Sequence, residues 1–161
     1  MACPHLPPEL WLEIFRHCEA QDLWSSLRFT NKQLKDCAED VVCSTILQSF
    51  TIAQSFSLGA GTRHRWYDVR GSVILAFSGL SKHNSQYALF DDISFHPEPC
   101  HQRVWEKWNQ ICGAGVGEDL EWRITLDGAE TRRVKMPKLV ISAEHGAWCD
   151  WREMLDGYFG H

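Results

Sequence analysis

Histidine and cysteine side chains, the residues best suited to hold a metal ion, gather in two short stretches of this sequence. The first stretch contains His96, Cys100 and His101, and the second contains His145 and Cys149. Structural zinc sites usually draw a closely spaced pair of ligands from each half of the site, such as C-x-x-C or H-x-x-x-H. The spacing here is mixed, and scattered Cys and His are the commoner explanation. We therefore expect no metal and no other cofactor, and keep a small zinc-stabilised binding protein as an alternative.

No set of residues has the pattern of a known catalytic site. The sequence contains no G-x-S-x-G, H-E-x-x-H or G-x-x-x-x-G-K-[ST] motif. The glycines at 113, 115 and 117 follow a predicted helix, whereas a phosphate-binding loop follows a strand and opens a helix. We predict that the protein is not an enzyme. A Cys–His pair brought together from distant positions is the catalytic alternative that the sequence leaves open.

Seven cysteines are scattered through the chain, at positions 3, 18, 37, 43, 100, 112 and 149. Their odd number and irregular spacing favour reduced thiols in a cytoplasmic or nuclear protein. The first residues lack the basic region and apolar stretch of a secretory signal. The longest apolar run, 73–77, is too short to cross a bilayer. We therefore expect a cytoplasmic or nuclear location and no membrane partner.

The net charge of −5 argues against a nucleic-acid partner, since binding to phosphates requires a basic face. Arg63, Arg65 and Arg70 lie close together in the sequence. A single small cluster of this kind is typical of a solvated loop.

Two Trp-x-x-Trp pairs are the most conspicuous aromatic feature. Trp105 and Trp108 fall in a predicted helix over 102–112, and Trp148 and Trp151 fall in a predicted helix over 147–158. Residues three apart share one face of a helix. Such pairs usually pack a helix against a strand, but aromatic side chains also dominate protein interfaces. Trp148 and Trp151 are therefore weak candidates for substrate contact.

The elements that must position these residues alternate beyond residue 62. Apolar or alternating runs predict strands at 73–77, 93–95, 120–126 and 139–142. The second and fourth of these precede the two predicted helices. Asp127-Gly128 predicts a turn after the third strand.

The first part of the chain has a different pattern, that of short helices. Proline at 7 and 8 is typical of a helix start, because the first turn needs no N–H partner. Leu10, Ile14 and Cys18 then recur at helical spacing. Thr30 and Gln33 have the spacing of a capping box at the start of a third helix. Helices this short cannot bury a core alone, so their apolar faces need a partner.

These N-terminal residues resemble an F-box in the form common in fungal proteins. The resemblance covers roughly residues 5–48. It is carried, in order, by Leu6-Pro7-Pro8-Glu9-Leu10, Ile14-Phe15, Asp22-Leu23, Leu27 and Thr30-Asn31-Lys32. It implies that this segment docks on the Skp-type adaptor of a cullin–RING ubiquitin ligase, and that the remainder recognises an unknown protein substrate. The implied adaptor-binding residues are Leu6, Pro7, Glu9, Leu10, Ile14, Phe15, Leu23 and Leu27.

A helix-turn-helix DNA-binding protein is the structural alternative for residues 6–42. It would need a basic second or third helix. Arg28, Lys32 and Lys35 are present, but acidic residues accompany them at 22, 36, 39 and 40. The local charge therefore opposes phosphate binding.

We predict an α+β fold with three parts. Residues 1–50 form a three-helix F-box domain, the Gly/Ser-containing stretch 51–62 is a linker, and residues 63–161 form a small α/β region of irregular strand–helix units. These units also weakly resemble degenerate leucine-rich-type repeats, which predicts a partial solenoid. An uncapped stack would expose apolar surface around Trp148, Trp151, Tyr158 and Phe159.

Overall fold

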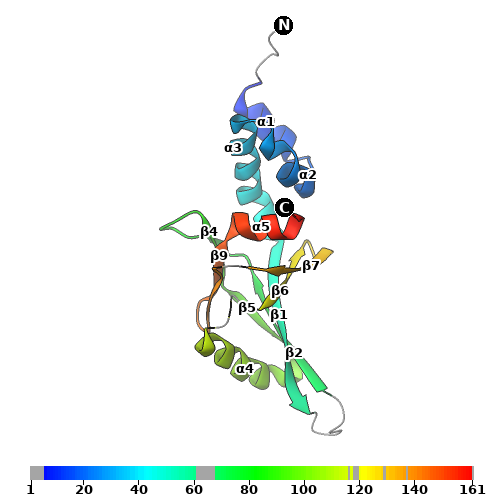
Figure 1. The fold of residues 1–161 in the computed structure, drawn as a ribbon, viewed down its shortest axis with the longest axis vertical. Coiled ribbons are helices and arrows are strands. Elements are labelled where there is room, and N and C mark those ends of the chain that lie inside the picture. Colours follow the sequence, from blue (N-terminus) through cyan, green and yellow to red (C-terminus); the bar gives the residue numbers. More distant parts are fainter. Residues whose placement is uncertain are drawn as a thin grey trace.

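The computed structural model describes residues 6–60, 68–115, 117, 120–128, 130–136 and 138–160. Three short helices come first and lie together at one end of the molecule (Figure 1). They are α1 (Pro8–Phe15), α2 (Ala20–Ser25) and α3 (Lys32–Val41), with single helical turns η1 (Leu27–Phe29), η2 (Val42–Ile46) and η3 (Leu47–Ser49) between and after them.

Of the two predicted helix starts, the proline at the first turn of α1 is confirmed and the capping box at α3 is not. Pro8 occupies the first position of α1, as expected for a residue that lacks an N–H donor. The predicted capping box at α3 is wrong. The cap is Asn31, whose side chain accepts a hydrogen bond of 2.9 Å from the Leu34 N–H. Gln33 instead donates to the Leu6 carbonyl at 3.2 Å, and so ties the chain before α1 to α3.

Two antiparallel sheets and two further helices make up the rest of the described residues. The five-stranded sheet has the order β5-β2-β1-β6-β7, and the four-stranded sheet has the order β3-β4-β9-β8. The strands are β1 (Phe50–Ala60), β2 (Asp68–Ala76), β3 (Gly79–Leu80), β4 (Tyr87–Phe90), β5 (Asp92–His96), β6 (Glu121–Leu126), β7 (Glu130–Lys135), β8 (Val140–Ser142) and β9 (Gly146–Asp150). The turn η4 (Glu98–Cys100) leads into helix α4 (His101–Ala114), and the last helix is α5 (Trp151–Phe159).

The expected α+β class is confirmed. The strands predicted at 93–95, 120–126 and 139–142 are present within one residue, and the strand predicted at 73–77 is the second half of a longer strand that begins at Asp68. The expected linker over 51–62 is wrong where the structure describes it. Residues 50–60 form β1, which pairs with β2 along its length and with β6 at its start. Apolar side chains at every second position, Phe50 and Ile52 and then Phe56 and Leu58, place one face of this strand toward the interior.

The partial solenoid is also not what the structure shows. In both sheets every described pair of neighbouring strands is antiparallel, whereas a stack of strand–helix repeats makes a parallel sheet. The helix predicted over 147–158 is a strand up to Asp150 and a helix only from Trp151. Its two tryptophans therefore do not share a helix face.

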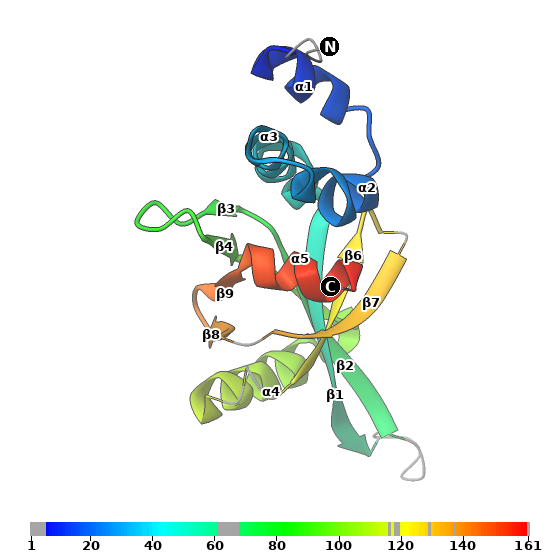
Figure 2. The same ribbon diagram turned by 45° about the horizontal axis from the view of Figure 1, so that its top comes forward.

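The predicted exposure of the C-terminal aromatics is wrong for Trp151 and Tyr158, whereas Trp148 and Phe159 are partly exposed. Trp151 and Tyr158 are each only 1% exposed. Trp151 packs against Trp24 of α2, with ring centroids 5.6 Å apart, and Tyr158 packs edge-on against Phe50 of β1. Figure 2 shows the reason: α5 lies between the N-terminal helices and the sheets. It closes the large hydrophobic core from the side of α2.

Candidate functional site

Helix α1 presents an exposed apolar face. Leu10 and Ile14, one helical turn apart, are 50% and 43% exposed, large fractions for aliphatic side chains. Pro7 and Glu9 are exposed beside them, and Leu6 is half-buried. Exposed apolar side chains grouped on one short helix are typical of a protein-binding surface.

Two of the predicted adaptor-facing residues point the other way. Phe15 and Leu23 are almost fully buried, in a small core that joins α1, α2 and α3. Leu27 is half-buried and packs against the same core. Their helical spacing is the same as that of the exposed residues, so periodicity alone could not separate inward from outward positions.

One exposed aromatic residue escaped the sequence prediction. Phe29, in the turn η1, is 61% exposed, and the Arg28 guanidinium lies 4.7 Å from its ring centroid. A single Phe between Arg28 and Thr30 breaks the apolar periodicity, and that break is the signal by which it could have been found.

A polar cluster joins the N-terminal helices to α5. Asp156 accepts hydrogen bonds from the Trp24 indole at 2.9 Å and from the Arg28 guanidinium at 2.8 Å, through the same oxygen. The guanidinium also stacks on the Trp24 ring, 3.7 Å from its centroid. Nearby, Arg152 binds Glu39 of α3 at 2.7 Å, and this hydrogen bond raises the pKa of Arg152. These contacts bridge segments more than 100 positions apart, so they fix the helices on the sheets.

The candidate metal ligands do not form a site among the residues described. No group of three or more His, Cys, Asp or Glu side chains in this part of the chain could hold a metal ion. His145 lies exposed on the turn between β8 and β9, while Cys149 is buried in the core. Burial raises the pKa of the Cys149 thiol to about 12. His101 stacks edge-on against Phe95 instead of facing a common centre.

A groove on the outer face of the four-stranded sheet contains Trp148. Its volume is about 710 Å³. An apolar row crosses three strands in register and consists of Leu89 of β4, Trp148 of β9 and Val140 of β8. The remaining residues that line the groove are Ser81, Tyr87, Asp91, Lys138 and His145. Of the two weak candidates for substrate contact, the structure therefore places Trp148 at a surface and Trp151 in the core.

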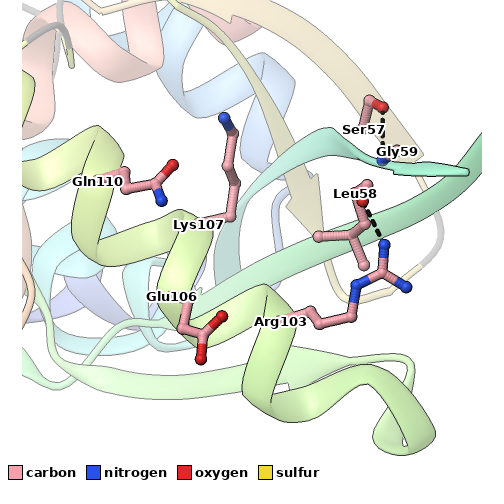
Figure 3. A pocket seen from close by; sticks show the side chains of 7 residues that line it. All are labelled: Ser57, Leu58, Gly59, Arg103, Glu106, Lys107 and Gln110. Atoms are coloured by element: carbon pink, nitrogen blue, oxygen red, sulfur yellow. Dashed lines mark hydrogen bonds between the residues drawn. The ribbon is translucent and has the colours of Figure 1, made fainter.

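A second, polar recess of about 340 Å³ lies between α4 and the end of β1. Figure 3 shows Arg103 donating a hydrogen bond to the Leu58 carbonyl, and Lys107 and Gln110 further along the helix. Glu106 is the only carboxylate that lines the recess. The Ser57 hydroxyl in the lining donates a hydrogen bond to the Asp68 carboxylate, and no His or Cys lines the recess. Arg63 and Arg65, expected in a nearby loop, lie outside the described residues.

The exposed apolar face of α1 is typical of a protein-binding module. Comparison with known families agrees: residues 3–44 match the F-box domain. The N-terminal segment is thus an F-box domain, as its sequence resemblance predicts. No curated protein and no solved structure matches the chain.

An F-box domain supports a role in substrate recognition by SCF-type ubiquitin ligases, in which such domains bind Skp-type adaptors and are generally non-catalytic. Within the described residues, no helix is both long and apolar enough to span a membrane.

Proposed function

We propose that this protein is a non-catalytic receptor subunit of an SCF-type cullin–RING ubiquitin ligase, acting in the cytoplasm or the nucleus. It links a Skp-type adaptor, and through it a cullin, to a protein substrate that becomes ubiquitinated. The observation that carries the proposal is the F-box match at residues 3–44, on a segment whose first helix exposes Leu10 and Ile14.

The adaptor-binding surface in this proposal is narrower than the sequence alone suggests. Pro7, Glu9, Leu10 and Ile14 lie at the surface and can touch a partner without a change of conformation. Phe15 and Leu23 act indirectly, because they hold α1 against the other two helices. Leu6 and Leu27 are half-buried and lie at the margin of this surface.

The mechanism is proximity. The F-box holds the adaptor, the two-sheet region holds the substrate, and the chemistry of ubiquitin transfer belongs to other subunits. Linking two binding sites raises the effective concentration of one bound partner near the other. The groove that contains Trp148 supports the second half of this role, because partly exposed aromatic side chains are frequent anchors for a partner.

Adaptor binding tests the proposal directly. The double variant Leu10→Ala/Ile14→Ala removes two apolar anchors from the exposed face of α1. Anchors at an interface centre contribute about 2 kcal/mol or more each, so the pair is expected to weaken binding to a purified Skp-type adaptor by more than about 100-fold. Isothermal titration calorimetry measures this loss.

The matched control is Val140→Ala/Trp105→Ala, which removes two side chains of equal 43% exposure from the sheet region. It should bind the adaptor like the wild type. No binding by the wild-type chain, or equal binding by both double variants, would show that the F-box face is assigned wrongly.

A further inference from the structure

Strand β1 is flanked by another strand on both sides only in its first part. It pairs with β2 from Thr51 to Ala60 but with β6 only from Phe50 to Ala53. From Gln54 onward, no described strand pairs with the edge that β6 leaves. An unpaired edge is a template for an additional strand unless a protein covers or charges it.

The backbone groups at this open edge can be identified from the alternation of the strand. The Phe50 carbonyl accepts a hydrogen bond from the Phe77 N–H on the β2 side. Successive residues of an antiparallel strand direct their backbone groups to opposite sides, so Ser55 and Ser57 direct theirs to the open side. The Ser55 carbonyl accordingly accepts a bond of 3.4 Å from the Gln54 side chain rather than from a strand.

Three arginines surround this edge. Arg123 of β6 faces Arg133 of β7 in register, and Arg70 of β2 faces Ser57 of β1. The three side chains line one recess of about 250 Å³ together with Gln54, Ser55 and Glu121. Like charges directly opposite each other destabilise a sheet, so the Arg123–Arg133 pair is costly in the free protein.

The arginines lack acidic partners among the described residues. Arg123 donates a hydrogen bond to the Ser55 hydroxyl, and neither Arg70 nor Arg133 takes part in a described ion pair. Glu121 is the only carboxylate in the recess, and it faces Lys135 in register. The neighbouring recess along β1 adds Arg103 and Lys107 (Figure 3). The two recesses together carry several basic side chains, although the chain as a whole has a net charge of −5. A positive surface of this kind is complementary to an acidic partner.

We propose that the open edge of β1 binds an extended acidic peptide, which adds a strand beside Ser55 and Ser57 and pairs its carboxylates with Arg70, Arg123 and Arg133. Neighbouring strands lie about 4.8 Å apart, so arginines on β2, β6 and β7 are spread over roughly 14 Å of the sheet. That spread suits several separate carboxylates better than one phosphate group. The site goes beyond the proposed receptor function and does not depend on adaptor binding.

Nucleic acid is the less suitable partner for this surface. Proteins that bind single strands stack the bases on aromatic side chains. None of the residues that line the two recesses is aromatic. The backbone edge, in contrast, offers the donors and acceptors that a peptide strand uses.

The test uses the full chain and a short fluorescent peptide with glutamate at every second position. Fluorescence anisotropy at low ionic strength compares it with the same peptide carrying glutamine instead. We expect the glutamate peptide to bind and the glutamine peptide to bind at least about tenfold more weakly. Equal affinity for the two peptides, or no binding of either, would overturn the proposal.

Variants locate the site. Arg123→Gln/Arg133→Gln should weaken binding of the glutamate peptide by about tenfold or more. The control Arg16→Gln changes an exposed arginine just after α1 and should alter the affinity by less than about twofold. Arg70→Gln alone serves as a second variant if the double variant does not fold, with the same direction of change. Unchanged affinity in the folded variants would refute the assignment.

Two further arms decide the kind of ligand and the way it binds. A single-stranded oligonucleotide that binds more tightly than the peptide, or a glutamine peptide with one phosphoserine that does so, would overturn the choice of an acidic peptide. Hydrogen exchange should slow at the Ser55 and Ser57 amides when the glutamate peptide binds. Unchanged exchange there would rule out strand addition.

Discussion

The contact between Asp156 and the N-terminal helices allows a quantitative prediction. Replacing Asp156 by Ala removes the acceptor of two hydrogen bonds, from Trp24 and from Arg28. The Arg28 side chain is only 10% exposed and Trp24 is fully buried, so neither donor can turn freely to water. The variant leaves a nearly buried positive charge and a buried indole N–H unpaired.

The magnitude follows from these exposures. Hydrogen bonds to charged groups stabilise a protein by about 1.5–3 kcal/mol. Asp156 itself is 36% exposed, so solvent screening places its pair with Arg28 at the lower end of that range. We expect Asp156→Ala to lower the free energy of unfolding by about 2 kcal/mol, which corresponds to a fall of about 4–8 °C in Tm for a chain of this size.

Urea unfolding followed by tryptophan fluorescence measures the loss. Asp156→Asn is the intermediate variant, because its amide oxygen still accepts from Trp24 but the charge opposite Arg28 is gone; it should lose about 1 kcal/mol. The control is Glu13→Ala. Glu13 pairs with Arg16 but is 62% exposed, and such a pair contributes less than about 0.5 kcal/mol. If Asp156→Ala loses no more than the control, the cluster does not hold the helices on the sheets.

Three further predictions concern the sheets and the core. Gly146→Ala should lower the free energy of unfolding, measured by urea titration, by about 3 kcal/mol or more, because at its φ of +71° a Cβ would lie 2.0 Å from a backbone oxygen of β4. The control Gly128→Ala has a similar φ of +69° but open space around it, so it should lose about 1–2 kcal/mol, and equal losses would contradict the close approach. Trp151→Ala should lower the free energy of unfolding by about 3–5 kcal/mol in the same titration, and Trp148→Ala should lower it by less than half as much. The reverse order would refute the placement of Trp151 in the core and Trp148 in the groove. Burial raises the pKa of the Cys149 thiol from 9.0 to about 12. Between pH 9 and 12 the unfolded chain loses the proton that the folded chain keeps, so the free energy of unfolding is unaffected by this thiol below pH 9 and falls above it. The fall should be shallower in Cys149→Ala, and parallel pH profiles of the two proteins would show that the thiol is not responsible.

The sequence allowed the local elements to be predicted better than their arrangement. Leu120 to Leu126 alternates cleanly, so β6 and its Asp127-Gly128 turn follow from side-chain period and turn chemistry alone. Within β1, Ser57 and Gly59 favour a boundary between domains, whereas the apolar residues at alternating positions favour a strand. The polar and apolar signals conflict within this one segment, and the pairing of its backbone with β2 makes it a strand.

The candidate site shows the same limit. That α1 begins at Pro8 and carries an apolar stripe follows from the sequence. Which stripe residues face outward depends on where α3 packs, and this separates exposed Leu10 from buried Phe15. The Trp-x-x-Trp spacing predicts a helix at Trp148, but this residue lies in β9, where it pairs with Leu89 and Val140, and strand pairing overrides the helical preference.

The position of α5 bears on how the chain is made. The ribosome makes Trp24, Arg28 and Glu39 before their partners Asp156 and Arg152, which are more than 100 positions later in the sequence. Contacts of such long sequence separation form late, since the intervening chain must first be closed into a loop. Until α5 has been synthesised, Trp24 lacks the side chains that cover it, and the nascent helices carry an uncovered apolar surface. During synthesis this surface is accessible to chaperones or to an adaptor, so a protein that binds the three N-terminal helices can reach them before α5 does.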